Sequence, residues 1–245
     1  MDSINANSGT SPQTYARIGG ILYIVIIVLG IFYELMVKDK IIVVGNATAT
    51  MANLKSMEFL WRLGILAELV SSIIGFCLVF IMYKLTKPVN KDMAMLAAFF
   101  NLAACTIQTV YILKRVEVLF PIGTAEYLNA FNSEQLSALI SLTLKSHVFG
   151  FGIALLMFGP YFLFTGFLIF KSRYLPKFIG VLYIISGLGY LVNSFMLILA
   201  PQLSGLVFMI IVLPVFIGEM SLALTFIIKG VNMEEWKKYF IQKEI

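Results

Sequence analysis

The sequence has few of the residues on which metal, haem and thiol chemistry depend. It contains one histidine, His147, and two cysteines, Cys77 and Cys105, both of which fall inside apolar runs. A zinc site normally needs three or four His, Cys or carboxylate ligands, and covalent haem attachment needs Cys-x-x-Cys-His. Neither pattern occurs, and His-Glu-x-x-His is missing too. We therefore expect no metal, no cofactor and no disulfide framework.

The signatures of other functional classes are also missing. The chain has no Gly-x-Ser-x-Gly nucleophile turn for His147 to activate, and no phosphate-loop or dinucleotide fingerprint. Its 18 Lys and Arg against 13 Asp and Glu give a net charge of +5, but the basic residues form no motif interleaved with stacking aromatics. We expect no nucleic-acid partner, and the absences argue against an enzyme.

Charge is scarce and apolar residues dominate the chain. Only 13% of the residues are charged and 60% are hydrophobic, with a mean hydropathy of +0.93. Soluble domains are roughly 45 to 50% apolar, so lipid rather than water is the expected solvent. About 20 helical residues cross a bilayer, and helices satisfy their own backbone hydrogen bonds there. We therefore predict an all-α integral membrane bundle of about six transmembrane helices. The predicted spans are Tyr15 to Met36, Leu60 to Tyr83, Met93 to Leu113, His147 to Phe170, Phe178 to Ala200, and Leu206 to Ile228.

The spans divide the chain into a polar N-terminal tail (1–14), a six-helix membrane domain (15–228) and an amphipathic C-terminal tail (229–245). The first 14 residues contain no Lys or Arg, so we read the first span as a retained helix rather than a signal peptide. With the N-terminus inside, 11 of the 18 Lys and Arg face the cytoplasm and 7 face outward. This predicts a plasma-membrane protein with both termini in the cytoplasm.

The two long outer loops carry helix-start signals. Asn46 is placed to cap a short helix that runs toward Lys55, and Asn132 with Gln135 has the form of a capping box. Apolar residues continue from that box along one face to His147, so we expect this helix to run directly into the fourth span.

A further capping pattern precedes the C-terminal tail. It pairs Asn232 with Glu235, and Met233, Trp236 and Phe240 share the face opposite several lysines. We expect an interfacial helix on the inner leaflet.

Three carboxylates lie inside the predicted spans, Glu34 near a span end and Glu68 and Glu219 further in, and an ionisable group there costs several kcal/mol unless it is paired or hydrated. Glu219 lies roughly 20 Å into the sixth span, too deep for its side chain to reach water. Glu68 is followed on its own face by Ser71, Ser72 and Gly75, a stripe that should face protein.

Other polar residues inside the predicted spans are candidate site residues for the same reason. In the predicted topology Glu34, Glu68, Gln108, Asn193 and His147 fall in the outer half of the bilayer, and Asn101 and Glu219 lie nearer its middle. A polar crevice that opens outward would collect them. The candidate ligand-binding residues are therefore Glu219, Glu68, Asn193, Asn101, Gln108, His147 and Glu34. The alternative is that these groups only join helices through hydrogen bonds of about 0.6 kcal/mol each, and that His147 is an interfacial residue.

Glycines form a simpler pattern in the fourth span. Gly152, Gly159 and Gly166 recur every seven residues, which puts them on one helix face. Small residues at this spacing let a neighbouring helix approach closely.

The chain resembles the bacterial membrane proteins grouped as domain of unknown function 4386. The resemblance covers nearly the whole chain and rests on segments in the first, second, fourth, fifth and sixth spans and the first outer loop. These segments are Arg17 to Tyr23, Gly45 to Thr50, Arg62 to Gly64, His147 with Phe158 and Gly159, Leu175 to Leu182, Gly189 to Phe195, and Leu213 to Leu224. It implies a multi-pass membrane fold and no established activity.

Three hypotheses follow for function. The leading one is that the chain binds or transports a small molecule, lipid or ion, with Glu219 and Glu68 lining one buried polar site and exchanging a proton for a cationic or polar ligand. The second is a structural or regulatory membrane protein without a ligand. The third is a lipid-acting intramembrane enzyme that uses Glu68 or Glu219 as acid or base, although no nucleophile or metal motif supports it. Membrane lipids are partners under each hypothesis.

Overall fold

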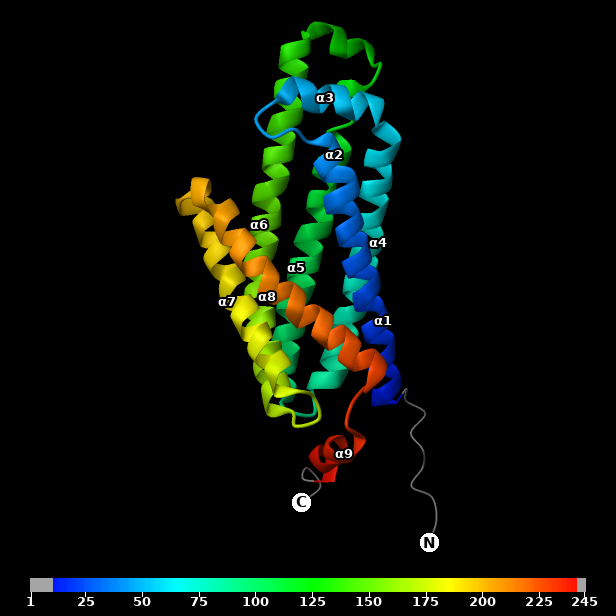
Figure 1. The fold of residues 1–245 in the computed structure, drawn as a ribbon, viewed down its shortest axis with the longest axis vertical. Coiled ribbons are helices and arrows are strands. Elements are labelled where there is room, and N and C mark those ends of the chain that lie inside the picture. Colours follow the sequence, from blue (N-terminus) through cyan, green and yellow to red (C-terminus); the bar gives the residue numbers. More distant parts are fainter. Residues whose placement is uncertain (1–10, 242–245) are drawn as a thin grey trace.

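The computed structural model describes residues 11–241, which form α-helices, one π-helical segment and two short 3-10 helices joined by turns, with no β-strand in that range. Six of the helical segments are long and apolar enough to cross a membrane (Figure 1), as predicted. The elements are α1 (Pro12–Ile31), η1 (Phe32–Lys38), α2 (Asp39–Ile41), α3 (Ala47–Ser56), α4 (Glu58–Thr86), α5 (Lys91–Glu117), η2 (Phe120–Ile122), η3 (Glu126–Ala130), α6 (Ser133–Lys171), α7 (Lys177–Leu199), α8 (Pro201–Ile228) and α9 (Met233–Ile241).

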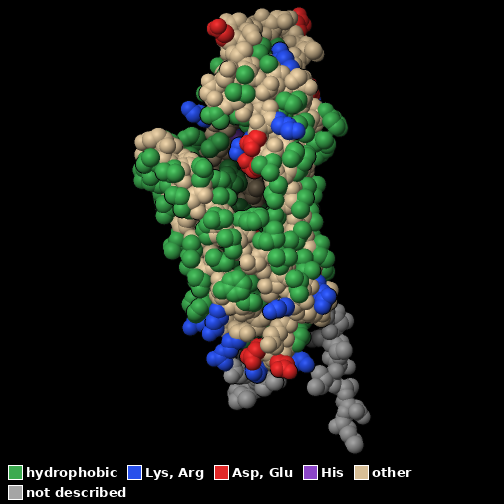
Figure 2. All heavy atoms as spheres, in the orientation of Figure 1, with side chains coloured by type: hydrophobic (Ala, Val, Ile, Leu, Met, Phe, Trp, Pro, Cys, Tyr) green, Lys and Arg blue, Asp and Glu red, His purple; other side chains and the backbone are tan. Residues whose placement is uncertain are grey.

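The bundle has two ends of different construction. The end that carries α3, η2 and η3 is called the loop end, and the end where α1 begins and α8 finishes is called the terminal end (Figure 1). Charged side chains gather near the two ends, and the side chains between them on the face shown in Figure 2 are almost all apolar. This division is what a bilayer-spanning bundle requires.

Several helices extend beyond the predicted spans. The first begins at Pro12 rather than Tyr15, because the Ser11 side chain accepts a hydrogen bond from the Thr14 amide and proline suits the first helical turn. Residues 12–14 of the predicted tail are thus helical, and residues 1–10 lie outside the described range. The third span runs to Glu117 instead of stopping at Leu113.

The predicted caps at the loop end are confirmed. Asn132 and Gln135 form a reciprocal capping box with two hydrogen bonds of 2.9 Å, and α6 then continues unbroken for 39 residues. Asn46 accepts from the Ala49 amide at 2.9 Å and starts α3. The fourth span therefore projects past its neighbours at the loop end (Figure 1).

The predicted glycine face of α6 packs against α7. A Cβ atom on Gly166 would lie 2.7 Å from the Gly180 carbonyl oxygen, and one on Gly187 would lie 2.7 Å from the Gly159 oxygen. These separations are too short for any side chain, so the two backbones touch. Around this contact lies an aromatic core in which the rings of Phe162 and Tyr183 stack at 4.7 Å.

The C-terminal helix α9 is docked on the terminal end. Asn232 starts it by accepting from the amides of Glu234 and Glu235, but the Glu235 carboxylate pairs with Lys238 and does not complete the predicted box. Trp236, which we expected on a lipid-facing surface, is 6% exposed and packs edge-on against Tyr174 at 4.8 Å. Burial raises the pKa of the Tyr174 hydroxyl, which stays a neutral donor to the Leu85 carbonyl at 2.6 Å.

Candidate functional site

A large cavity of about 970 Å³ lies in the half of the bundle nearer the loop end. It is lined from η1, the 42–47 loop, α4, α5, α6, α7 and α8. Five of the seven candidate residues line it, namely Glu34, Glu68, Gln108, His147 and Asn193. Figure 2 shows a hollow in this face, above α8 and beside the column of α1.

The large cavity exists because α8 diverges from α1. Near the terminal end the two helices touch, since a Cβ atom on Gly20 would lie 2.8 Å from the Ala223 carbonyl oxygen. Toward the loop end α8 follows α7 instead, where Gly189 lies against Ile211 (Figure 1). Glu34 on one side and Phe208 on the other line the resulting space. The cavity therefore opens sideways, toward the lipid that surrounds a membrane bundle.

An ion pair between α4 and α5 lies in the wall of this cavity. The Arg115 Nε and a Glu68 carboxylate oxygen are 2.5 Å apart, and their side chains are 8% and 19% exposed. The guanidinium also donates to the Tyr33 hydroxyl and lies 4.0 Å from the centre of that ring. The Trp61 indole N–H donates to the Arg115 carbonyl at 2.9 Å. Arg115 of α5 is thus held by side chains of two other helices, α4 and η1.

Arg115 was not among the predicted site residues. It lies beyond Leu113, where the predicted third span ends, and was counted with the basic residues of the outer loop. The extra turn of α5 brings it inside. On the opposite side Gly64 lets Tyr33 approach α4, because a Cβ there would lie 2.8 Å from Val37 and 3.2 Å from the Tyr33 ring.

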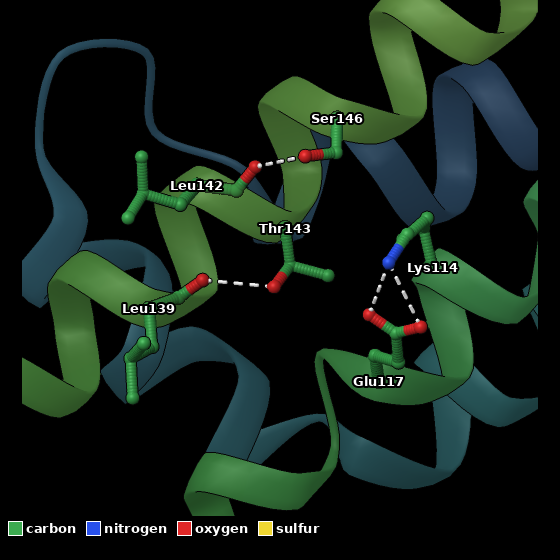
Figure 3. A network of polar contacts seen from close by, with 6 residues as sticks. All are labelled: Lys114, Glu117, Leu139, Leu142, Thr143 and Ser146. Carbon is green, nitrogen blue, oxygen red and sulfur yellow. Dashed lines mark hydrogen bonds and ion pairs between the residues drawn. The ribbon is translucent and has the colours of Figure 1, made fainter.

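The other charges near the cavity are largely paired within their own helices. Lys38 pairs with Glu34 at 2.6 Å, and Lys114 pairs with Glu117 at 2.8 Å (Figure 3). Lys145 also lines the cavity, is exposed, and has no acidic partner within residues 11–241. The lining therefore carries one positive charge more than its carboxylates balance.

Hydroxyl groups of α6 near the loop end are satisfied locally. Figure 3 shows the Thr143 hydroxyl donating to the Leu139 carbonyl at 2.9 Å and the Ser146 hydroxyl donating to the Leu142 carbonyl at 3.0 Å. Such bonds to the preceding helical turn create no link between helices. Neither of these two residues lines the large cavity.

Asn193 presents an unused acceptor at the cavity. The residue is 5% exposed, and its side-chain oxygen has no hydrogen-bond partner within the described residues. Its neighbour Ser194 instead donates to the Gly152 and Tyr190 carbonyls, both at 2.9 Å. An unpaired buried amide oxygen costs about 1 to 3 kcal/mol, which a hydrogen-bond donor entering the cavity would recover.

A small cavity of about 110 Å³ lies deeper in the bundle. Glu219 of α8 and Asn101 of α5 line it together with Ser71, Ser72, Tyr23 and Tyr161, and Gln108 lines both cavities. No Lys, Arg or His is among its lining residues. The hydroxyls of Tyr23 and Tyr161 are 3.2 Å apart.

The single buried site that we predicted is thus two cavities in the structure. Glu68 and Glu219 line different ones, and all five residues predicted for the outer half of the bilayer line the large cavity, while Gln108 lines the small one as well. The role of these residues in ligand binding stays a prediction. Within residues 11–241 no group of three or more His, Cys, Asp or Glu side chains is placed to hold a metal ion.

These features define a class, the multi-pass helical membrane proteins with six spans. The chain belongs to the family described as domain of unknown function DUF4386, whose model matches residues 18–230. It is also 26% identical over 174 residues to an uncharacterized protein of Archaeoglobus fulgidus, covering 68% of this chain and 88% of that protein. No solved structure matches the chain.

Proposed function

We propose that this protein binds an amphipathic small molecule or lipid, which enters the large cavity from the bilayer between η1 and α8. We further propose that it lies in the plasma membrane with both termini in the cytoplasm. This orientation is supported by the excess of Lys and Arg in the segments assigned to that side. It would place the large cavity in the outer leaflet.

The proposal rests on two features of the large cavity taken together. The cavity opens sideways, and its polar interior includes a hydrogen-bond acceptor without a partner within the described residues. The large cavity is walled mostly by apolar groups with a few polar side chains, as ligand pockets are, and it is bounded by two helices that diverge within the membrane. Deep inside, Asn193 and the Glu68–Arg115 pair offer hydrogen bonds. The apolar tail of an amphipathic ligand would therefore contact the apolar wall of the cavity, and its polar head would contact these polar groups.

The residues that line the large cavity also indicate the chemistry of the ligand's polar head group. The unpaired oxygen of Asn193 needs a donor such as a hydroxyl group. Lys145, which no carboxylate of the described chain neutralises, favours one negative charge. A phosphate or carboxylate head that also carries hydroxyl groups meets both requirements.

The test is equilibrium binding to the purified full chain of lysophosphatidylglycerol, whose head is an anionic phosphate with hydroxyl groups. The zwitterionic lysophosphatidylcholine and free glycerol 3-phosphate are the comparison ligands. We expect saturable binding of the first, weaker binding of the second and none of the third. Asn193→Leu should weaken lysophosphatidylglycerol binding about tenfold, the effect of one lost hydrogen bond of about 1.4 kcal/mol.

Two further variants test how much the charge of the ligand's head group contributes to binding. Lys145→Gln should reduce the preference for the anionic head about fivefold, since a lysine near a membrane surface contributes about 1 kcal/mol. Lys91→Gln, at the exposed start of α5 near the terminal end, is the matched control and should bind as the wild type does. Equal binding of glycerol 3-phosphate would show a soluble-anion site instead, and no saturable binding of any probe would favour the structural alternative.

A further inference from the structure

We infer that the small cavity is a binding site for a monovalent cation of the size of Na⁺, with Glu219 as its charged ligand. This site lies apart from the proposed amphiphile site and goes beyond it. The inference starts from charge. Glu219 has no ion pair or hydrogen bond within residues 11–241, and the groups that face it from α1, α4, α5 and α6 include no basic side chain.

A lone carboxylate in the interior of a membrane bundle carries a large desolvation cost. The nearest buried cation that the large cavity offers, Arg115, is already neutralised by Glu68. One positive charge beside Glu219 restores neutrality, whereas a divalent ion would leave a buried net charge of the opposite sign. Charge balance therefore selects a monovalent ion.

Six of the neutral side chains that line the small cavity with Glu219 carry oxygen atoms; the other lining residues are apolar groups and Cys105, whose thiol donates to the Asn101 side-chain oxygen at 3.5 Å. The Ser71 hydroxyl donates to the Ala67 carbonyl at 2.9 Å, which leaves its lone pairs free to accept or coordinate. Ser72, Asn101 and the Tyr23 and Tyr161 hydroxyls line the same space. Hard cations bind to such sets of carboxylate, hydroxyl and amide oxygens and to water.

The volume also fits an ion with part of its hydration shell. At about 30 Å³ for each water molecule, the cavity of about 110 Å³ has room for an ion and about two waters. A proton bound to Glu219 would need neither this space nor a ring of oxygens. The room beside the carboxylate is the reason that we favour a cation.

Gln108 lies between the two cavities, because it lines both. On the side toward the terminal end, the small cavity is closed by buried aromatic residues, among them Phe162 and Tyr183. An ion would therefore reach Glu219 through the large cavity, past Gln108. Access to the ion site then depends on whether the large cavity is occupied.

The experiment is binding of radioactive Na⁺ to the purified full chain at mildly alkaline pH, with choline replacing Na⁺ at constant ionic strength. We expect saturable binding that unlabelled NaCl displaces. Glu219→Gln should abolish it, and Ser71→Ala should weaken it severalfold. Glu58→Gln, which removes a carboxylate from an exposed ion pair with Arg62, is the matched control and should retain wild-type binding.

Lysophosphatidylglycerol binding reports separately on the proposed function, because its determinants line the large cavity. A Glu219→Gln variant that still binds this lipid is folded, so its loss of Na⁺ binding would be specific. Absence of saturable Na⁺ binding to the wild type would overturn the inference. So would Na⁺ binding that Glu219→Gln leaves unchanged, or a thermal stability that follows pH but not Na⁺ concentration, which would indicate a proton alone.

Discussion

At the scale of single residues, the Glu68–Arg115 pair is the part of the large cavity most sensitive to change. Both side chains are mostly removed from solvent, and Arg115 gains its remaining contacts from Tyr33 and Trp61. Desolvating two charges offsets much of their attraction, so the intact pair adds little net stability. Removing one partner is different, because it leaves the other charge buried and alone.

We therefore predict that Arg115→Gln lowers the free energy of unfolding by about 3 kcal/mol. Arg62→Gln is the matched control, because it breaks an exposed Arg–Glu pair and should cost less than about 1 kcal/mol. The measurement is equilibrium unfolding of the detergent-solubilised protein. The double variant Glu68→Met, Arg115→Met should recover most of the loss, and equal effects of Arg115→Gln and Arg62→Gln would contradict the burial argument.

The residues of the site were only partly predictable from the sequence. Ionisable and amide side chains within apolar runs stand out, and this is how Glu68, Asn193 and Glu219 were found. Arg115 was missed because a basic residue next to Lys114 at the end of a span looks like an interfacial anchor. The Asn193 side-chain oxygen lacks a hydrogen-bond partner within the described chain because of which residues the other helices place beside it. A single sequence does not specify those neighbours.

At the scale of elements, the contact between α6 and α7 leaves no room for added atoms. A Cβ atom on Gly180 would lie 2.6 Å from the Gly166 carbonyl oxygen and 2.7 Å from the Phe170 amide nitrogen. Both neighbours are backbone, so no side-chain rotation relieves the clash. Close backbone approach of this kind stabilises helix pairs in membranes through van der Waals contact.

Gly180→Ala should therefore cost about 1 to 3 kcal/mol by forcing the two helices apart. Gly30→Ala is the control, because no atom lies within 4 Å of the added Cβ, and it should be neutral or stabilising by about 0.5 to 1 kcal/mol through helix propensity. Thermal unfolding of both variants under the same conditions measures the difference. A Gly180→Ala protein as stable as the wild type would show that this contact is not close in the protein.

Apolar runs, prolines and capping residues were sufficient to predict the six spans and the helix starts at Asn46 and Asn132. The path of α8 was not predictable in the same way. Except for Glu219, that helix is apolar on all sides near its middle, so its sequence specifies no preferred face. Its direction follows from two close contacts, at Gly20 of α1 and Gly189 of α7.

At the scale of the whole molecule, the divergence of α8 from α1 produces both proposed sites. It opens the large cavity toward lipid and leaves the small cavity beneath it, where α8 returns to the bundle and carries Glu219 inside (Figure 1). The family assignment and the six spans define the architecture. The divergence of α8 from α1 adds a cavity that could hold a ligand. Sideways entry of an amphiphile is therefore the central claim.

The most direct measurement is photo-crosslinking in liposomes with lysophosphatidylglycerol that carries a diazirine in its acyl chain, followed by peptide mapping. We predict labels on Phe208 and Phe151, which both line the large cavity and whose rings pack edge to face with centres 6.5 Å apart, and displacement of these labels by unmodified lysophosphatidylglycerol. Met209, one residue away on α8 but 71% exposed, should be labelled without displacement, as any lipid-facing residue is. Labelling confined to Met209 and other outward-facing residues would contradict entry into the cavity.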